Sequence, residues 1–504
     1  MRSRTENSVK NIIFGLGVQG IEVVLKFVGR TIFIRYLAVE YLGVNGLFSE
    51  ILTMFSLAEL GIGSAIGYAL YKPLQANNHD KIAALMNLYK KSYCIIGIVV
   101  GLVGIGLIPF LDFIIRDAGS LQDEIIRIYL FYLFNTASTY FFSYKSTLLT
   151  ADQKNYIVLT IKEICNVVRT IIQCLVLVRT HNFYFYLAIE TVLIFINNMW
   201  VSKYTDYKYP YLRSSKERIE KQEIFDIMKN VKALFLTKIS TILVNSTDNM
   251  LITAVVGLRE TGLYSNYTIF ISLINTVLAQ VFNNMYPSVG NLNAEGDIKK
   301  SHFIFKTLHM MNFWLYSTAA IGFYLIINDI ITLWLGEKFI LPQNICFVIA
   351  VNIYIKGMLN AVWIFKDTYG LFKFGQYMTL LSAILNIILS VILGMKWGLG
   401  GILIATAISR ILTNSWYDPA MLFKHGFVCS VSRYYLNYLG YTVLCVCVGG
   451  VLTVICNFWL ANTIIMLILK IVIVGIFPSI IYIFIFYKSD EFQYLLRKVI
   501  KRDD

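Results

Sequence analysis

Three charged residues lie four positions apart in a stretch that is otherwise apolar. Residues 20–35 read GIEVVLKFVGRTIFIR and contain Glu22, Lys26 and Arg30. In a helix, residues four apart share one face, so the stretch predicts an apolar helix with a charged stripe. A charge at the bilayer centre costs roughly 2.5–3.5 kcal/mol on insertion scales and persists there only when it is paired or faces water. The stripe therefore indicates a functional surface within a membrane protein.

The composition indicates a chain that is mostly surrounded by lipid. The 504 residues are 57% hydrophobic and 15% charged, whereas soluble domains are about 25% charged. Apolar runs long enough to cross a bilayer recur along the chain. We therefore predict an all-α integral membrane protein with about 14 transmembrane helices, near residues 11–36, 42–71, 88–115, 124–149, 155–179, 183–204, 226–256, 262–287, 306–335, 343–368, 374–394, 400–423, 434–457 and 462–487.

The loops divide into two sets by their content of Lys and Arg. Most of these residues lie at the two ends of the chain and in alternate loops, while the other loops hold Arg35, Arg116, Arg179, Arg259, Lys338 and Lys396. Because Lys and Arg accumulate on the cytoplasmic side, both termini of this multi-pass chain are expected there. This bias and contact with anionic lipid account for the net charge of +14, so nucleic acid is not expected as a partner.

An offset of 219 residues relates the two halves of the chain. It places Lys10 on Lys229, Gly43 on Gly262, Lys81 on Lys300 and Lys154 on Lys373. We interpret the halves as two six-helix bundles related by a pseudo-twofold axis around a central cavity. The predicted divisions are an N-terminal lobe at 1–205, a cytoplasmic linker at 206–225, a C-terminal lobe at 226–425, two extra transmembrane helices at 430–488 and a cytoplasmic tail at 489–504.

The same offset predicts a second polar stripe. It carries Gln19, Glu22, Lys26 and Arg30 onto Lys238, Thr241, Asn245 and Asn249. The spacing of three, four and four keeps each set on one helix face. The two stripes are therefore expected to face one another across the axis rather than to face lipid.

Cations outnumber anions at the expected membrane depth. The cations are Lys26, Arg30, Lys162, Arg169, Lys238, Lys356, Arg410 and Lys470, and the anions are Glu22, Glu59, Glu163 and Asp248. A cavity with surplus positive charge attracts anions, and Arg and Lys are suited to phosphate. The predicted substrate-binding residues are Lys26, Arg30, Lys238, Asn245, Asn249, Arg169, Lys356 and Arg410.

Some of these charges also fit structural roles. Glu22 and Lys26 have the spacing of an ion pair within one helix. Lys162 and Glu163 lie toward the cytoplasmic end of their helix, where long side chains reach the interface. Lys470 belongs to the extra pair of helices and is expected to be peripheral.

No catalytic or metal-binding pattern accompanies the charges. The eight cysteines lie mostly within apolar runs, with no C-x-x-C and no His at ligand spacing, so neither a disulfide nor a metal site is expected. The sequence has no phosphate-binding P-loop and no G-x-S-x-G. We therefore expect a protein that is not an enzyme and has no cofactor. A proton or Na⁺ is the expected coupling ion, and its candidate ligands are Glu22, Glu59 and Asp248.

The segment YLGVNGLFSEILTMFSLAELGIGSAIGYALYKPL at 41–74, preceded by SVKNIIFGLG and RTIFIRYL, resembles the polysaccharide-transport (Wzx-like) family of flippases. Multidrug exporters and lipid II flippases belong to the same superfamily. The resemblance implies two six-helix lobes and transport of an undecaprenyl-diphosphate-linked oligosaccharide to the outer leaflet of the bacterial plasma (inner) membrane. Related lipid II flippases hold the pyrophosphate with cavity cations and admit lipid between the first and eighth helices. Lys26 and Arg30 are cations on the first helix of this chain, and this resembles the use of cations and of the first helix in those flippases.

We therefore hypothesise a flippase that moves a lipid-linked repeat unit for capsule, O-antigen or exopolysaccharide synthesis by alternating access. Lys26, Arg30 and Lys238 would contact the diphosphate, and Asn245 and Asn249 would contact sugars. Membrane lipid and the polymerase and chain-length proteins of the same pathway are the expected partners. The alternative is a cation-coupled multidrug exporter of the same superfamily, which would need uncompensated carboxylates in its cavity.

Overall fold

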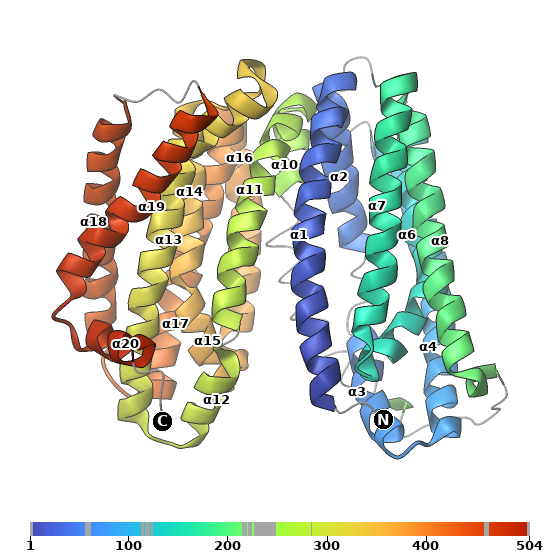
Figure 1. Ribbon diagram of the computed structural model, residues 1–504, viewed down its shortest axis with the longest axis horizontal. Helices are drawn as coiled ribbons and strands as arrows, with labels where there is room; N and C mark the ends of the chain where they lie inside the picture. The colour runs from blue at the N-terminus through green and yellow to red at the C-terminus, as the bar shows by residue number, and fades with distance from the viewer. Residues whose placement is uncertain are drawn as a thin grey trace. The chain divides into compact units, whose positions relative to one another are not determined.

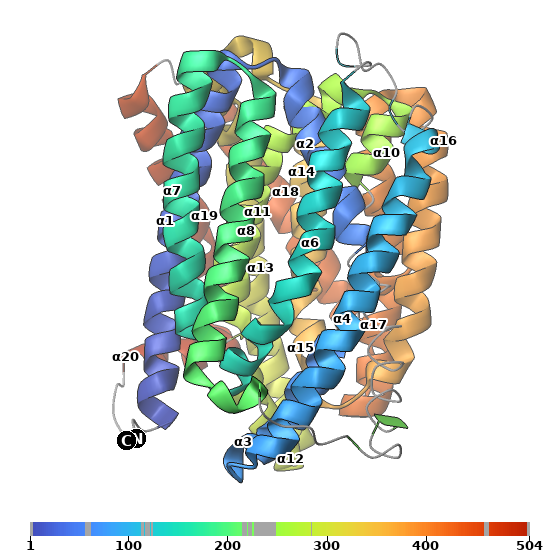
Figure 2. The ribbon, with the colours of Figure 1, turned by 90° about the vertical axis from the view of Figure 1, so that its right-hand side faces the viewer.

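The computed structural model in Figures 1 and 2 describes residues 4–55, 62–111, 115, 121, 124–213, 219, 224–225, 248–283, 285–457 and 463–500. Regular structure in these residues is entirely helical, which confirms the predicted all-α membrane fold. The α-helices are α1 (Arg4–Tyr36), α2 (Val39–Phe55), α3 (Ile62–Gln75), α4 (His79–Leu107), α6 (Ile125–Ala151), α7 (Asn155–Thr180), α8 (Phe183–Lys208), α10 (Asp248–Val255), α11 (Leu258–Asn283), α12 (Tyr286–Ala294), α13 (Ile298–Leu335), α14 (Gln343–Met358), α15 (Asn360–Thr368), α16 (Phe372–Leu412), α17 (Asn414–Leu422), α18 (Ser432–Asn457), α19 (Ile464–Phe486) and α20 (Asp490–Ile500).

One predicted span is interrupted. The span expected at 343–368 divides into α14 and α15 next to Leu359. The spans expected at 374–394 and 400–423 correspond to α16, which consists of two helices that meet at a non-helical residue, Gly398, with φ 59° and ψ −140°. Glycine tolerates this positive φ because it has no Cβ. A Cβ at Gly401 would lie 2.0 Å from the Leu393 carbonyl oxygen, so the chain turns sharply here, in agreement with the predicted separation near 394–400.

Eight helical segments of the described chain are long and apolar enough to cross a membrane. They are His79–Phe110, Phe183–Lys208, Leu258–Phe282, Ile298–Leu335, Gln343–Thr368, Tyr377–Phe427, Ser432–Cys456 and Ile464–Phe486. α1 and α7 contain 33 and 26 residues, which also exceeds the roughly 20 residues that a bilayer requires. α1 and α7 carry the charged residues described above, and they are not among the eight apolar segments. The protein is therefore a multi-pass membrane protein whose charges are concentrated on particular helices.

The chain divides into two compact units, residues 1–262 and 263–504. In unit 1, α7 packs against α1 and α8, and α6 packs against α4 and α8; Figure 2 shows α6, α7 and α8 side by side. One apolar core of this unit includes Phe33, Phe48 and Tyr129, and a second includes Tyr89 and Tyr144. The predicted lobe and linker boundaries stay predictions.

The long helix α13 organises unit 2. It packs against α14, α15, α18, α19 and α20, and Figure 1 shows it running beside α14 and α19. Its aromatic residues supply much of the interior: Phe305 contacts the Phe365 ring, and Phe313 is stacked on Tyr441 at 4.5 Å between ring centroids. The two extra helices, α18 and α19, are therefore packed onto the bundle through α13.

Helix ends repeat at the offset of 219 residues. α1 ends at Tyr36 and α10 at Val255, and α2 and α11 begin at Val39 and Leu258. The next pair of helices behaves in the same way, because α3 and α12 end at 75 and 294, and α4 and α13 begin at 79 and 298. The residues that cap α4 and α13 are also 219 apart: each accepts a hydrogen bond from the backbone N–H three residues on. The internal repeat inferred from sparse identities is thus present in the helix boundaries.

Two glycines make a reciprocal contact between α2 and the first turn of α11. A Cβ added to Gly43 would lie 2.2 Å from the carbonyl oxygen of Leu258, and one added to Gly262 would lie 2.4 Å from that of Val39. Leu258 is Val39 plus 219, and Gly262 is Gly43 plus 219. The contact is therefore self-complementary, like the isologous interface of a twofold dimer. It requires glycine on both sides because backbone meets backbone.

We predict that Gly43→Ala and Gly262→Ala each destabilise the protein by about 1–3 kcal/mol or more, since the new methyl group would overlap backbone atoms. The double variant should cost little more than either single variant, because one substitution already separates the two helices. Thermal unfolding of the detergent-solubilised protein measures this.

Gly46→Ala on the same helix is the matched control. Its Cβ would lie 3.8 Å from the Thr261 methyl carbon, an ordinary contact distance. Equal stability of Gly43→Ala and Gly46→Ala would contradict the proposed backbone contact.

Candidate functional site

The charged stripe of α1 is connected to α7 by an ion pair. Lys162 Nζ donates to Glu22 Oε1 at 2.9 Å. The partner of Glu22 is therefore a residue of the neighbouring helix rather than Lys26, one turn along α1. Lys162 is about half exposed, and pairs of this kind contribute at most about 1 kcal/mol. The pair orients the stripe more than it stabilises the bundle.

Lys26 and Arg30 differ in their surroundings. The Lys26 side chain is exposed in unit 1 and has no ion pair with another described residue. Arg30 is half-buried, and Tyr186 of α8 lies within electrostatic range of both Arg30 and Arg169. The structure therefore brings together two of the predicted cations, one from α1 and one from α7.

A carboxylate that the sequence interpretation missed balances part of this charge. Glu190 of α8 lies with Oε1 3.9 Å from Arg169 Nη1. Among the described side chains of this region in unit 1, Lys26, Arg30, Lys162 and Arg169 are basic, and Glu22, Glu163 and Glu190 are acidic. Glu190 therefore offsets part of the positive charge of the four basic residues. Glu190 was detectable in principle, because it interrupts the apolar run of the span predicted at 183–204.

One predicted cation of unit 2 contacts an amide side chain. Arg410 Nη1 of α16 donates to Asn352 Oδ1 of α14 at 3.4 Å, and Asn352 Nδ2 donates to the Leu403 carbonyl oxygen at 2.8 Å. Lys356, a second predicted cation, follows Asn352 by four residues on α14, a spacing that places it on the same helix face. Both cations are half-buried.

The remaining predicted residues have separate surroundings. Lys470 of α19 pairs with Asp329 of α13 at 2.5 Å, which holds an extra helix on the bundle. Asn249 Nδ2 donates to Glu50 Oε1 of α2 at 3.1 Å, and Asp248 begins α10. The other predicted residues, Lys238, Asn245 and Glu59, lie outside the described residues, so their roles stay predictions. Within the described part of the chain, no group of acidic, His or Cys side chains is arranged to hold a metal ion.

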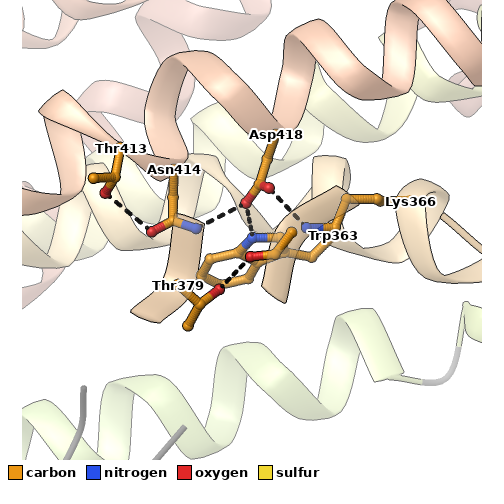
Figure 3. Close-up of polar contacts among 7 residues, drawn as sticks. Trp363, Lys366, Thr379, Thr413, Asn414 and Asp418 are labelled. Atoms are coloured by element: carbon orange, nitrogen blue, oxygen red, sulfur yellow. Dashed lines mark hydrogen bonds and ion pairs between the residues drawn. The ribbon is translucent and has the colours of Figure 1, made fainter. Parts of the chain in front are cut away.

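The most fully buried ion pair described is Lys366 with Asp418, shown in Figure 3. Lys366 Nζ donates to Asp418 Oδ1 at 2.7 Å, while Trp363 Nε1 and Asn414 Nδ2 donate to Oδ2 at 3.0 and 3.1 Å. A Cβ at Gly375 would lie 2.4 Å from Lys366 Nζ. This glycine therefore leaves the space in α16 that the ammonium group occupies between α15 and α17.

Unit 1 contains a comparable pair. Lys145 Nζ of α6 lies 2.7 Å from Asp206 Oδ1 of α8. α6 and α8 correspond to the fourth and sixth predicted spans. α15 and α17 form the C-terminal parts of the tenth and twelfth predicted spans. Lys145 and Lys366 both lie within helices, and each pairs with an aspartate of another helix. Each unit thus joins corresponding helices through a Lys–Asp pair.

The family model described as "Polysaccharide biosynthesis protein" matches residues 8–292, which is more than half of the 504 residues. The chain belongs to this family. The resemblance stated from the Tyr41–Leu74 segment is thereby confirmed. No curated protein sequence matches the chain.

Solved transporter structures share the fold of this member of the polysaccharide biosynthesis protein family. The lipid II flippase MurJ in an inward closed conformation has 15% identity and a TM-score of 0.71, covering 95% of this chain and 99% of MurJ. An inward-facing multidrug resistance MATE transporter has 12% identity and a TM-score of 0.57, with 80% and 96% coverage. The MATE transporter VcmN of Vibrio cholerae has 11% identity and a TM-score of 0.52, with 85% and 99% coverage. These likenesses establish the fold.

We predict that Asp418→Ala destabilises unit 2 by about 3–5 kcal/mol, because it leaves the Lys366 ammonium group buried without a counter-charge. The double variant Lys366→Met/Asp418→Asn should be closer to the unsubstituted protein, since it removes both charges and keeps an acceptor for Trp363. Thermal unfolding of the detergent-solubilised protein provides the comparison.

The control is Lys300→Ala, which removes an exposed pair with Glu295 and should change stability by less than about 1 kcal/mol. If Asp418→Ala were as mild as Lys300→Ala, the buried pair would not contribute as described.

Proposed function

We propose that the protein is a flippase that moves an undecaprenyl-diphosphate-linked oligosaccharide repeat unit from the cytoplasmic to the outer leaflet of the bacterial plasma membrane. The observation that carries this proposal is the family match over residues 8–292, which includes α1 with its charged stripe. The likeness to the lipid II flippase is a second support, because the name of that protein states transport of a lipid-linked molecule. Both termini are proposed to be cytoplasmic.

The proposed diphosphate ligands are cations that the structure describes in both units. Lys26 is exposed on α1 and Arg30 lies one turn further along. In unit 2, Arg410 donates to Asn352 of α14, the helix that also carries Lys356. Guanidinium groups bind phosphate oxygens in a bidentate manner, and ammonium groups bind them as point charges. Lys238, Asn245 and Asn249 are proposed to complete the site, with the amides contacting sugar hydroxyls.

Transport is proposed to follow alternating access, with the headgroup enclosed by protein and the prenyl chain remaining in lipid. A ligand shifts such an equilibrium only through different affinities for the two states. The diphosphate provides that difference if the cations converge on it in one state more than in the other. The released lipid-linked unit would then pass to polymerase and chain-length proteins of the same pathway.

We predict that Arg30→Ala reduces surface polysaccharide by about tenfold or more, since a hydrogen bond to a charged group contributes about 1.5–3 kcal/mol, while the protein remains folded in the membrane. Lipid-linked repeat units should accumulate and stay inaccessible to glycan-specific reagents added outside spheroplasts. The assay uses a deletion strain that expresses each variant at equal level.

Arg35→Ala is the matched control, because Arg35 is an exposed residue at the end of the same helix and should support normal export. Normal export by both Arg30→Ala and Arg30→Glu would exclude the role assigned to Arg30. A deletion strain without accumulated lipid-linked units would contradict the proposed function itself.

A further inference from the structure

One buried carboxyl group, that of Glu163 in unit 1, forms no ion pair with another residue that the structure describes. Glu163 of α7 is 5% exposed. Its Oε2 accepts a hydrogen bond from Asn166 Nδ2 at 3.3 Å, and its Oε1 has no hydrogen-bond partner among the described residues. Sequence analysis expected Glu163 to extend toward the cytoplasmic interface. The structure instead places it inside the bundle.

The charges around Glu163 are already engaged with other partners. Glu22 of α1 and Lys162 and Arg169 of α7 are the charged side chains that act on it electrostatically. Lys162 donates to Glu22, and Arg169 lies beside Glu190 of α8.

The other helices packed against α7 do not change this arrangement. α6 and α8 join through the pair of Lys145 with Asp206, and Glu190 is the α8 carboxylate near Arg169. Lys26 of α1 is exposed in unit 1. Because Lys162 and Arg169 each have a carboxylate partner, the described contacts leave Glu163 without a counter-charge at hydrogen-bond distance.

A carboxylate in this position is unfavourable, whereas a neutral carboxyl group is not. Burying an ionised group without a paired cation costs far more than burying its neutral form, and such groups take up a proton instead. A bound metal cation would need several oxygen ligands, but Asn166 directs its NH₂ group, not its oxygen, at Glu163. A proton needs only the one free oxygen, Oε1.

We propose that Glu163 is a proton-binding site that is neutral in this conformation and releases its proton when its surroundings become hydrated. The step forms one O–H bond on binding and breaks it on release, and the proton passes between the carboxyl oxygen and water with no change of oxidation state. Coupling of this step to transport rests on the proposed function. If the proposed function holds, proton movement through Glu163 of α7 drives export. α7 also packs against α1, which carries the charged stripe.

Infrared difference spectroscopy of the purified full-length protein, titrated between acidic and alkaline pH, tests the proposal without a substrate. A protonated carboxyl group has a C=O band separate from the carboxylate bands. We expect the unsubstituted protein to show a protonated-carboxyl band that is lost in Glu163→Gln. Glu295→Gln is the control, since Glu295 is exposed and paired with Lys300, and it should leave the band unchanged.

Glu163→Asp keeps a carboxyl group in the same place and should give a shifted band, which makes the assignment possible even if Glu163→Gln does not fold. An identical band in all variants would overturn the proton site while leaving the proposed function intact.

Coupling between proton release by Glu163 and transport is tested by a separate measurement. The dependence of surface export on an imposed pH gradient should be lost in Glu163→Gln. Retained dependence in that variant would overturn coupling through Glu163, whether or not the band changes.

Discussion

The cost of an unpaired charge in an apolar environment explains most of the arrangement of polar residues in this protein. Lys470, Lys162 and Lys366 each lie within 3 Å of a carboxylate oxygen on another helix. Each pair therefore also fixes the relative position of two helices. Where Lys and Asp are fully enclosed, as between α15 and α17, tryptophan and asparagine supply the remaining hydrogen bonds of the carboxylate.

The cations proposed to bind a diphosphate headgroup are less enclosed than these pairs. Lys26 is exposed in unit 1, Arg30 and Arg169 lie within electrostatic range of Tyr186, and Glu190 lies beside Arg169. The family match and the flippase-like fold are independent of this electrostatic pattern. The same region includes Glu163, so anion binding and proton uptake would take place on adjacent helices, α1 and α7.

Helix positions were predictable from sequence because apolar run length and loop charge depend only on local composition. The start of α7 at Asn155 and of α8 at Phe183 agree with the prediction. Partners of charged residues were not predictable in this way. Glu190, Asp329 and Asp418 meet cations that lie on other helices, and nothing in the local pattern of Lys470 or Lys366 indicates which carboxylate is its partner. The separation of two spans near Gly398 was predicted, but the backbone angles of the turn were not, since glycine marks an interruption without giving its geometry.

The glycine contact between α2 and α11 has an evolutionary consequence. In a duplicated gene, Gly43 and Gly262 descend from one codon, and Val39 and Leu258 from another. An ancestral six-helix polypeptide would have used that single glycine twice when two copies associated. In such a history most of the sequence diverges after fusion of the copies, which fits the sparse identities at the 219-residue offset. Neither glycine could change alone, because a Cβ at either position would overlap backbone atoms of the other helix.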